Sequence, residues 1–320
     1  MEPTRRPTSV RGVPGRRSLS IFMLIALALT ACSGGSNAPK ADSPSPSSGD
    51  AGSTAAESET TSTSSASDGT PSPTASPQNL DEVVDIDGNR GLYVRCSGQG
   101  SPTVVMEGGD GDTSNSYAFA ESIIASLTRT CVYDRANLGW SDPAPGVRQL
   151  SDLVGDLEGL LWSAEIPGPY VLVGASGGGY ITAGYAAAHP KEVAGMVFVD
   201  TGAPLQDPPE EIVAATAPDN PANVEHRDYL QVERDAWAGR HEIGDIPITV
   251  VTVKFSGAAI KESPFPTERR AMARNVQRQR GWLVLSPLAR QIIVRTGHAV
   301  EEEQPGLVID VIRDVVKAAS

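Results

Sequence analysis

The stretch "VLVGASGGGY", residues 171–180, decides the fold. Its apolar start is typical of a buried strand, and the alanine-rich sequence "ITAGYAAA" at 181–188 is typical of a helix. A sharp turn from strand to helix strains the backbone of its central residue and needs very small neighbours. Gly174 and Gly178 complete a Gly-x-Ser-x-Gly pattern around Ser176. In this context the pattern favours Ser176 as a nucleophile over a serine in an ordinary glycine turn.

Strand-like and helix-like stretches alternate through the rest of the chain. Apolar runs predict seven strands, at 91–96, 103–108, 130–134, 170–174, 195–200, 248–253 and 290–296. Apolar residues at three- and four-residue spacing predict helices over 150–161 and 307–316. Several strands are continuously apolar, which is typical of strands that helices cover on both faces of a largely parallel sheet. The sequence therefore predicts an α/β fold.

Residues 1–31 have the pattern of an export signal. Five arginines precede a short apolar run at 19–29, which is shorter than a membrane-spanning helix needs. The sequence "LTAC" at 29–32 resembles the lipobox of bacterial lipoproteins, and this resemblance implies an acylated Cys32 that anchors the protein outside the cytoplasmic membrane. The alternative is an ordinary secretory signal with an incidental cysteine. The sequence "GRRSLSIF" at 15–22 also resembles a twin-arginine export signal.

A polar segment separates this signal from the folded domain. Residues 32–79 consist mainly of Ser, Thr, Ala, Pro, Gly and Asp, and such a composition cannot bury enough apolar surface to offset the entropy of ordering the chain. We therefore expect a disordered tether there and one folded domain at 80–320.

The net charge of the whole chain is −13, without a basic cluster in the domain. This charge argues against nucleic acid as a partner.

Four segments, in order along the chain, resemble the α/β-hydrolase superfamily. They are "VVMEGGDGD" at 104–112, "YDRANLGWSDP" at 133–143, the Ser176 segment at 174–200 and "RTGHAVEEEQP" at 295–305. The resemblance covers residues 82–317 and implies a mostly parallel eight-stranded sheet flanked by helices. It places a small cap, or lid, at 201–245. Asn137 stands at a glycine of the family pattern, and asparagine tolerates the left-handed conformation that such a position requires.

His298 is the expected general base. It follows the last predicted strand, and Gly297 gives its loop freedom to turn the imidazole toward Ser176. His189 precedes a proline at a helix end, while His226 and His241 lie in a polar stretch between strands. The family resemblance also places the base at His298.

The acid that orients this histidine has two candidates. Members of the family commonly carry it after the strand at 248–253, but no carboxylate follows that strand before Glu262. Some members place the acid directly after the strand that follows the nucleophile helix, which implies Asp200 here. We expect Asp200 to be the acid, with Glu262 as the alternative. Asp200 could also serve only as a turn residue.

The family resemblance implies an oxyanion site built from two backbone amides. One is the N–H of Gly177, the residue after the nucleophile, and the other comes from the loop after the strand at 103–108. Matching that loop to the family's His-Gly-x pattern places Glu107 at the histidine and Gly109 at the donor. Glu107 in place of the family's histidine does not remove a donor, because both donors are backbone groups.

The resemblance also implies a disulfide. In the family's sheet the second strand lies antiparallel beside the fourth, which brings Cys96 and Cys131 together. An exported protein meets an oxidising compartment in which such a pair forms and persists.

The residues and the resemblance together predict a membrane-tethered serine hydrolase that acts on a small-molecule or lipid ester, or on a related acyl bond. Dehalogenases and epoxide hydrolases of this fold attack with an aspartate, and the serine at position 176 therefore argues against both classes. No cofactor or metal is expected. Two alternatives remain, namely a non-catalytic binding lipoprotein on this fold and a cofactor-free acyltransferase or perhydrolase.

In the cap, a helical piece at 224–239 carries Tyr229, Leu230 and Trp237, which could face a ligand or simply pack.

Overall fold

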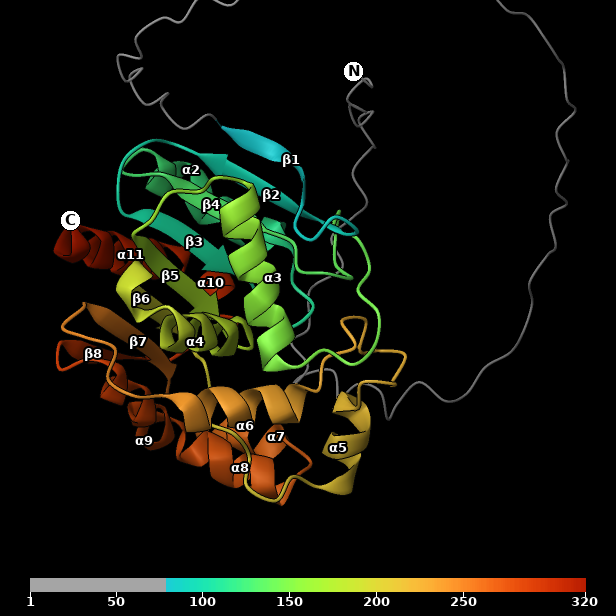
Figure 1. Cartoon of the computed structure of the whole chain (residues 1–320). Helices are drawn as coiled ribbons and strands as arrows, with labels where there is room; N and C mark the ends of the chain where they lie inside the picture. The colour runs from blue at the N-terminus through green and yellow to red at the C-terminus, as the bar shows by residue number, and fades with distance from the viewer. Residues whose placement is uncertain (1–78) are drawn as a thin grey trace, which may run out of the picture. The chain divides into compact units, whose positions relative to one another are not determined.

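The computed structural model describes residues 79–320 (Figure 1). The predictions for the export signal, for the tether up to residue 78 and for acylation of Cys32 lie outside these described residues. Across 79–320 we find no helix with both the length and the apolar character needed to cross a membrane.

An eight-stranded sheet forms the centre of the described domain, in the order β1-β2-β4-β3-β5-β6-β7-β8. The strands are β1 (Leu80–Asp85), β2 (Gly91–Ser97), β3 (Thr103–Glu107), β4 (Thr130–Tyr133), β5 (Tyr170–Ala175), β6 (Val193–Val199), β7 (Ile248–Val253) and β8 (Ala289–Val294). Strand β2 runs antiparallel to both β1 and β4, and the remaining neighbours are parallel. This confirms the predicted mostly parallel sheet.

The pattern of apolar residues located every strand except β1. Four of the six residues of β1 are exposed, because this edge strand packs little apolar surface. It therefore lacks the continuous apolar run that marks the buried strands β3, β5 and β7, in which every residue is buried.

Helices cover both faces of the sheet, and strand residues alternate between two apolar cores. On β5, Leu172 faces one core, whereas Val171 and Val173 face the other. The first core contains α3 (Leu150–Ser163) and α4 (Gly178–Ala188). The second core contains η1 (Ser114–Tyr117), α2 (Ala118–Ala125), α10 (Val300–Glu303) and α11 (Pro305–Ala319).

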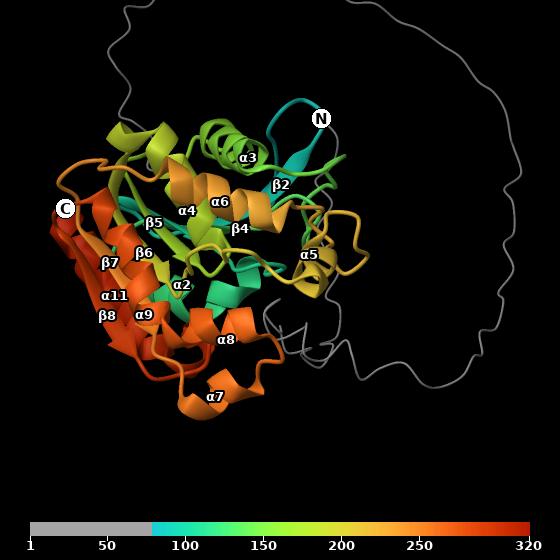
Figure 2. The ribbon, with the colours of Figure 1, turned by 90° about the horizontal axis from the view of Figure 1, so that it is seen from below.

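Two connections between strands carry additional helices, which gather at one end of the sheet (Figures 1 and 2). The segment between β6 and β7, where the sequence predicts a cap, contains α5 (Glu210–Thr216) and α6 (Tyr229–Gly239). Helix α6 begins five residues later than the helical piece expected from residue 224, because the side chain of Asp228 caps it by accepting a hydrogen bond from the N–H of Gln231. The connection between β7 and β8 contains α7 (Gly257–Glu262), α8 (Pro266–Ala273), α9 (Asn275–Gln279) and η3 (Arg280–Leu285), which the sequence analysis did not anticipate.

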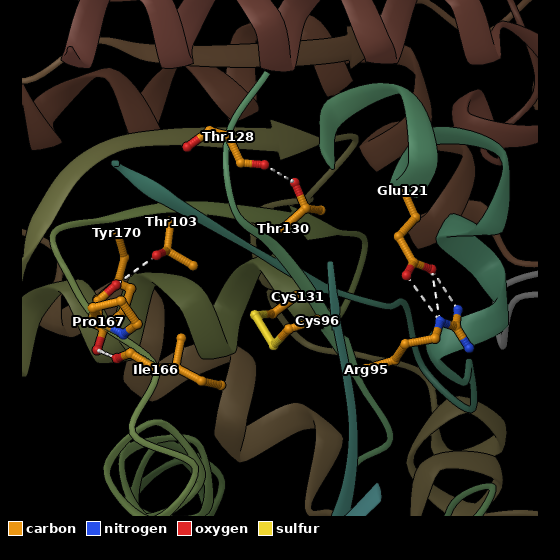
Figure 3. The surroundings of a disulfide bond; sticks show 10 residues. All are labelled: Arg95, Cys96, Thr103, Glu121, Thr128, Thr130, Cys131, Ile166, Pro167 and Tyr170. Carbon is orange, nitrogen blue, oxygen red and sulfur yellow. Dashed lines mark hydrogen bonds and ion pairs between the residues drawn. A yellow bond between two sulfur atoms is a disulfide. The ribbon is translucent and has the colours of Figure 1, made fainter. Parts of the chain in front are cut away.

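The expected disulfide is confirmed. Cys96 on β2 lies directly opposite Cys131 on β4, and their sulfur atoms are bonded (Figure 3). Both cysteines are buried in the core on the α3 and α4 side of the sheet. The bond ties the antiparallel edge of the sheet to its parallel part.

Replacing Cys96 and Cys131 together with alanine should lower the free energy of unfolding by about 2–4 kcal/mol, because the bond closes a loop between residues 35 positions apart. Urea unfolding followed by circular dichroism measures this change. Reduced wild-type protein is the matched control and should lose a similar amount. An unfolding midpoint that neither treatment moves would contradict a stabilising bond.

Candidate active site

Ser176 occupies a strained turn between β5 and α4. Its φ angle is +46°, a left-handed value that is rare for residues other than glycine. Its N–H donates to the carbonyl of Val199 at 2.8 Å. A Cβ atom at Gly174 would lie 2.5 Å from Cα of Gly179, and one at Gly178 would lie 2.4 Å from the carbonyl oxygen of Gly108. The close approach of strand, helix and β3 loop therefore requires glycine at both positions of the Gly-x-Ser-x-Gly pattern.

His298 lies within hydrogen-bond distance of both Ser176 and Asp200. Its Nε2 is 2.8 Å from Oγ of Ser176, and its Nδ1 is 2.7 Å from Oδ2 of Asp200. An ionised carboxylate only accepts, so this network assigns the proton to Nδ1 and leaves Nε2 to accept from the serine hydroxyl. The loop before the histidine is fixed by Glu303, whose carboxylate oxygens accept from the N–H of Gly297 at 2.9 and 3.0 Å.

Asp200 is only 2% exposed, yet its carboxylate is fully hydrogen-bonded. Besides the contact of Oδ2 with His298, Oδ1 accepts from the N–H of Val253 at 3.0 Å, from Asn275 at 3.0 Å and from Gln279 at 2.7 Å. Burial alone would raise the pKa of Asp200, but His298 and the other donors outweigh it and keep the pKa below its usual value. Asp200 therefore stays ionised beside the imidazole.

The pairing with Asp200 also shifts the pKa of the His298 imidazole, upward rather than downward. Burial alone would lower the pKa of His298, but the hydrogen bond and charge of Asp200, followed by the charges of Glu301 and Asp110, raise it above the usual value. The arrangement therefore stabilises an imidazolium, the form that a general base takes once it has accepted a proton.

The other candidates from the sequence lie elsewhere. Glu262, the alternative acid, is exposed at the last residue of α7. His189 lies beside Tyr185 with its ring nitrogens 3.6 and 3.7 Å from two surface glutamates. His226 and His241 each contact a backbone carbonyl near their own position in the chain.

Two residues that hold Asp200 were not predicted from the sequence. Asn275 and Gln279 lie one helical turn apart on α9 and both direct amide groups at Asp200. Their pattern in "NVQRQ" is that of an ordinary polar helix, so nothing in the sequence marks them. Only the path of the chain after β7 brings them to the site.

The two predicted oxyanion donors lie beside Ser176. Gly177 follows Ser176 directly, and a Cβ atom at Gly109 would lie 3.5 Å from Cβ of Ser176. Within residues 79–320, neither N–H donates a hydrogen bond to another protein group. Asn137, in the neighbouring segment, has the left-handed φ of +70° expected for its glycine-like position.

The cap residues that could have faced a ligand have packing contacts. Tyr229 is buried, and the guanidinium of Arg227 lies over its ring at 4.8 Å. Trp237 packs edge to face on the fully buried Trp282, with ring centroids 4.9 Å apart. Leu230 is partly buried on the same helix.

Comparisons with known proteins agree with this architecture. A protein-family model described as the alpha/beta hydrolase fold matches residues 102–240. An uncharacterized protein of Schizosaccharomyces pombe is 43% identical over 75 residues, or 23% of this chain. The chain spans only 14% and 24% of the length of the first two curated relatives that it matches.

Solved structures resemble almost the whole described domain. An esterase from Thermogutta terrifontis matches with a TM-score of 0.55 at 21% sequence identity, covering 76% of this chain and 99% of the esterase. Est816, described as an N-acyl homoserine lactone degrading enzyme, matches with a TM-score of 0.56 at 20% identity, covering 73% of this chain and all of Est816. At such identities the likeness concerns the fold. Together with the strand order, it establishes that the chain has the α/β-hydrolase fold.

The pKa of His298 should lie above the usual histidine value of about 6.5 and should fall below it in Asp200→Asn. The substitution removes the negative charge that opposes the effect of burial. Titration of the imidazole Cε1–H signal by nuclear magnetic resonance measures both values. Glu262→Gln is the matched control and should leave the pKa unchanged. A shift with Glu262→Gln but not with Asp200→Asn would contradict the pairing.

Proposed function

We propose that the chain is a serine hydrolase that cleaves a carboxylic ester, or a related acyl bond, through an acyl-enzyme on Ser176. The observation that carries this proposal is the continuous hydrogen-bonded series from Ser176 Oγ through His298 to Asp200, at 2.8 and 2.7 Å. A hydroxyl, a base and a buried acid in this order are what activates a serine toward a carbonyl carbon.

In the first half of the reaction, Oγ of Ser176 bonds to the substrate's carbonyl carbon while its proton passes to Nε2 of His298. The carbonyl electrons move to the oxygen, which becomes an oxyanion. The oxyanion then re-forms the C=O bond as the C–O bond to the leaving group breaks, and the imidazolium, stabilised by Asp200, donates its proton to the departing alkoxide. The products of this half are an alcohol and an ester between the acyl group and Ser176.

Water completes the cycle by the same path. It attacks the acyl carbon and gives a proton to Nε2 of His298, which returns the proton to Oγ of Ser176 as the acyl bond breaks. The released product is a carboxylic acid. These steps use only water and groups of the chain itself.

The amides of Gly177 and Gly109 are the proposed donors to the oxyanion. Both lie beside Ser176, and neither N–H donates to another group of the described domain. Fixed donors of this kind stabilise charge that develops in the transition state, and loss of one typically costs roughly 100- to 1,000-fold in turnover.

The comparisons support a hydrolase of acyl bonds. The Thermogutta protein is described as an esterase and Est816 as an enzyme that degrades N-acyl homoserine lactones, which are cyclic esters. Both chains are covered over nearly their full length. We infer an ester-like substrate for this chain from these two proteins and from the serine nucleophile together.

We further propose that the enzyme acts outside the cytoplasmic membrane, anchored by acylated Cys32. The export pattern of residues 1–31 and the lipobox-like "LTAC" support this location. The Cys96–Cys131 disulfide supports it as well, because structural disulfides persist mainly in oxidising compartments.

A fluorophosphonate probe should label the full chain, and Ser176→Ala should abolish labelling while leaving the fold intact. The probe reacts only with an activated serine. Ser122→Ala, at an exposed position of α2, is the matched control and should label like the wild type. In-gel fluorescence with circular dichroism of each variant gives the readout, and a folded wild type that takes no label would refute the proposed function.

Ester hydrolysis should lose activity as the pH falls, because only neutral His298 can accept the serine proton. Since its pKa is raised, the acid limb of kcat/KM should have its midpoint above about pH 6.5. Asp200→Asn should move the limb to lower pH and reduce kcat by about 10,000-fold. Initial rates on a p-nitrophenyl ester between pH 5 and 9, roughly the range in which histidine titrates, measure both effects. Retention of near wild-type kcat in Asp200→Asn would disprove its assignment as the acid.

A further inference from the structure

A cluster of buried charges lies beside residues 108–111, the loop after β3 that carries the proposed donor Gly109 and is called the oxyanion loop below. Its members come from the end of β3, the segment after β4 and the loop between α5 and α6. They are Glu107, Asp110, Arg135, Glu225 and Arg227. Four of these residues are less than 5% exposed, and the side chain of Asp110 is 12% exposed.

Arg135 connects this cluster to the backbone of the oxyanion loop. Its Nη1 donates to the carbonyl of Gly108 at 2.8 Å, and its Nη2 donates to the carbonyl of Gly109 at 2.6 Å. The same guanidinium donates to both carboxylate oxygens of Glu225, at 2.7 and 2.9 Å. Glu225 therefore fixes the orientation of the group that holds Gly109.

The loop between α5 and α6 also contacts the next residues of the oxyanion loop directly. Oε1 of Glu225 accepts from the N–H of Gly111 at 2.7 Å. Nη1 of Arg227 donates to Oδ1 of Asp110 at 2.8 Å. Residues 108–111 are thus held from one side by a segment more than a hundred positions later in the chain.

Asp110 in turn packs against the second oxyanion donor. A Cβ atom at Gly177 would lie 1.7 Å from Oδ1 of Asp110, so the carboxylate occupies the space that a side chain at position 177 would need. The ion pair with Arg227 therefore sets the distance between the two loops that carry the donor amides.

Buried ion pairs of this kind do little for stability, because the cost of removing charges from water offsets their attraction. In this cluster the pairs join segments far apart in the chain, and we infer that they fix the geometry of the loop after β3. Burial would raise the pKa of Glu225, but the charges of Arg135 and Arg227 hold it at about 2, so the carboxylate remains ionised over the working range of a histidine base.

We propose that Glu225 and Arg227 are positioning residues that hold the Gly109 N–H at the place where the oxyanion forms. They do not contact the reacting atoms. Glu225 acts through Arg135, and Arg227 acts through Asp110. This inference rests on the proposed function, and it gives the segment predicted to be a cap a second role, as a structural part of the oxyanion site.

The test compares Glu225→Gln with the wild-type full chain. Glutamine keeps the shape but loses the charge and one of the acceptor oxygens that Arg135 uses. We expect kcat for a p-nitrophenyl ester to fall about 10- to 100-fold, less than the loss of a whole oxyanion donor, with KM changed less than about threefold. The affinity for an alkyl boronic acid, which forms a tetrahedral adduct with an active serine, should fall by the same factor as kcat.

Glu121→Gln is the matched control. Glu121 accepts three hydrogen bonds from Arg95, between α2 and β2, so the same substitution breaks a similar Arg–Glu pair away from the oxyanion loop (Figure 3). It should leave kcat and boronic acid affinity unchanged. If Glu225→Gln fails to fold by circular dichroism, Arg227→Lys carries the test with the same readouts, because lysine retains the charge but not the reach and planar fork of arginine.

The outcomes separate this inference from the function on which it rests. If Glu225→Gln, or Arg227→Lys in its place, matches Glu121→Gln in kcat and boronic acid affinity, or changes KM alone, the positioning role is refuted and the hydrolase stands. If the wild type neither hydrolyses esters nor binds the boronic acid, the proposed function fails and this inference fails with it.

Discussion

The hydrogen bond between Asp200 and His298 is the interaction on which the rest of the site depends. It requires an ionised carboxylate that is almost completely removed from water. Burying such a charge costs free energy unless hydrogen-bond donors compensate for the lost hydration. The structure supplies three donors, namely the N–H of Val253 on β7 and the side-chain amides of Asn275 and Gln279 on α9. Once the carboxylate is in place, it determines which imidazole nitrogen carries the proton and therefore which one faces Ser176.

The central sheet and the peripheral helices contribute different parts of this site. The sheet places Ser176 after β5, Asp200 after β6 and His298 after β8, in loops at the same end of parallel strands. The segments between β6 and β8 add groups that contact these residues and their surroundings. Helix α9 holds Asp200, and the loop before α6 contacts Gly111 and Asp110 in the loop after β3.

Much of this arrangement could be predicted from the sequence, because its signals are local. Small residues around Ser176 predicted the sharp turn between β5 and α4, and continuous apolar runs predicted seven of the strands. The order of segments indicated His298 and Asp200, which the structure brings within hydrogen-bond distance of each other. Groups whose signal is not local were missed. The contact between Arg135 and Glu225 joins residues 90 positions apart, and both lie in stretches whose composition suits an exposed loop. Asn275 and Gln279 likewise acquire a role only from the way α9 packs against β7.

In the proposed mechanism, Ser176 carries the acyl group during turnover. The most direct test of this step is to mix the full chain with a p-nitrophenyl ester, stop the reaction in acid within the first turnovers and measure the intact mass and the digested peptides. We expect an added mass equal to one acyl group, located on Ser176 and absent from Ser176→Ala. Turnover of the ester with the acyl group on another residue, or with no covalent adduct in a rapid-quench series, would contradict it.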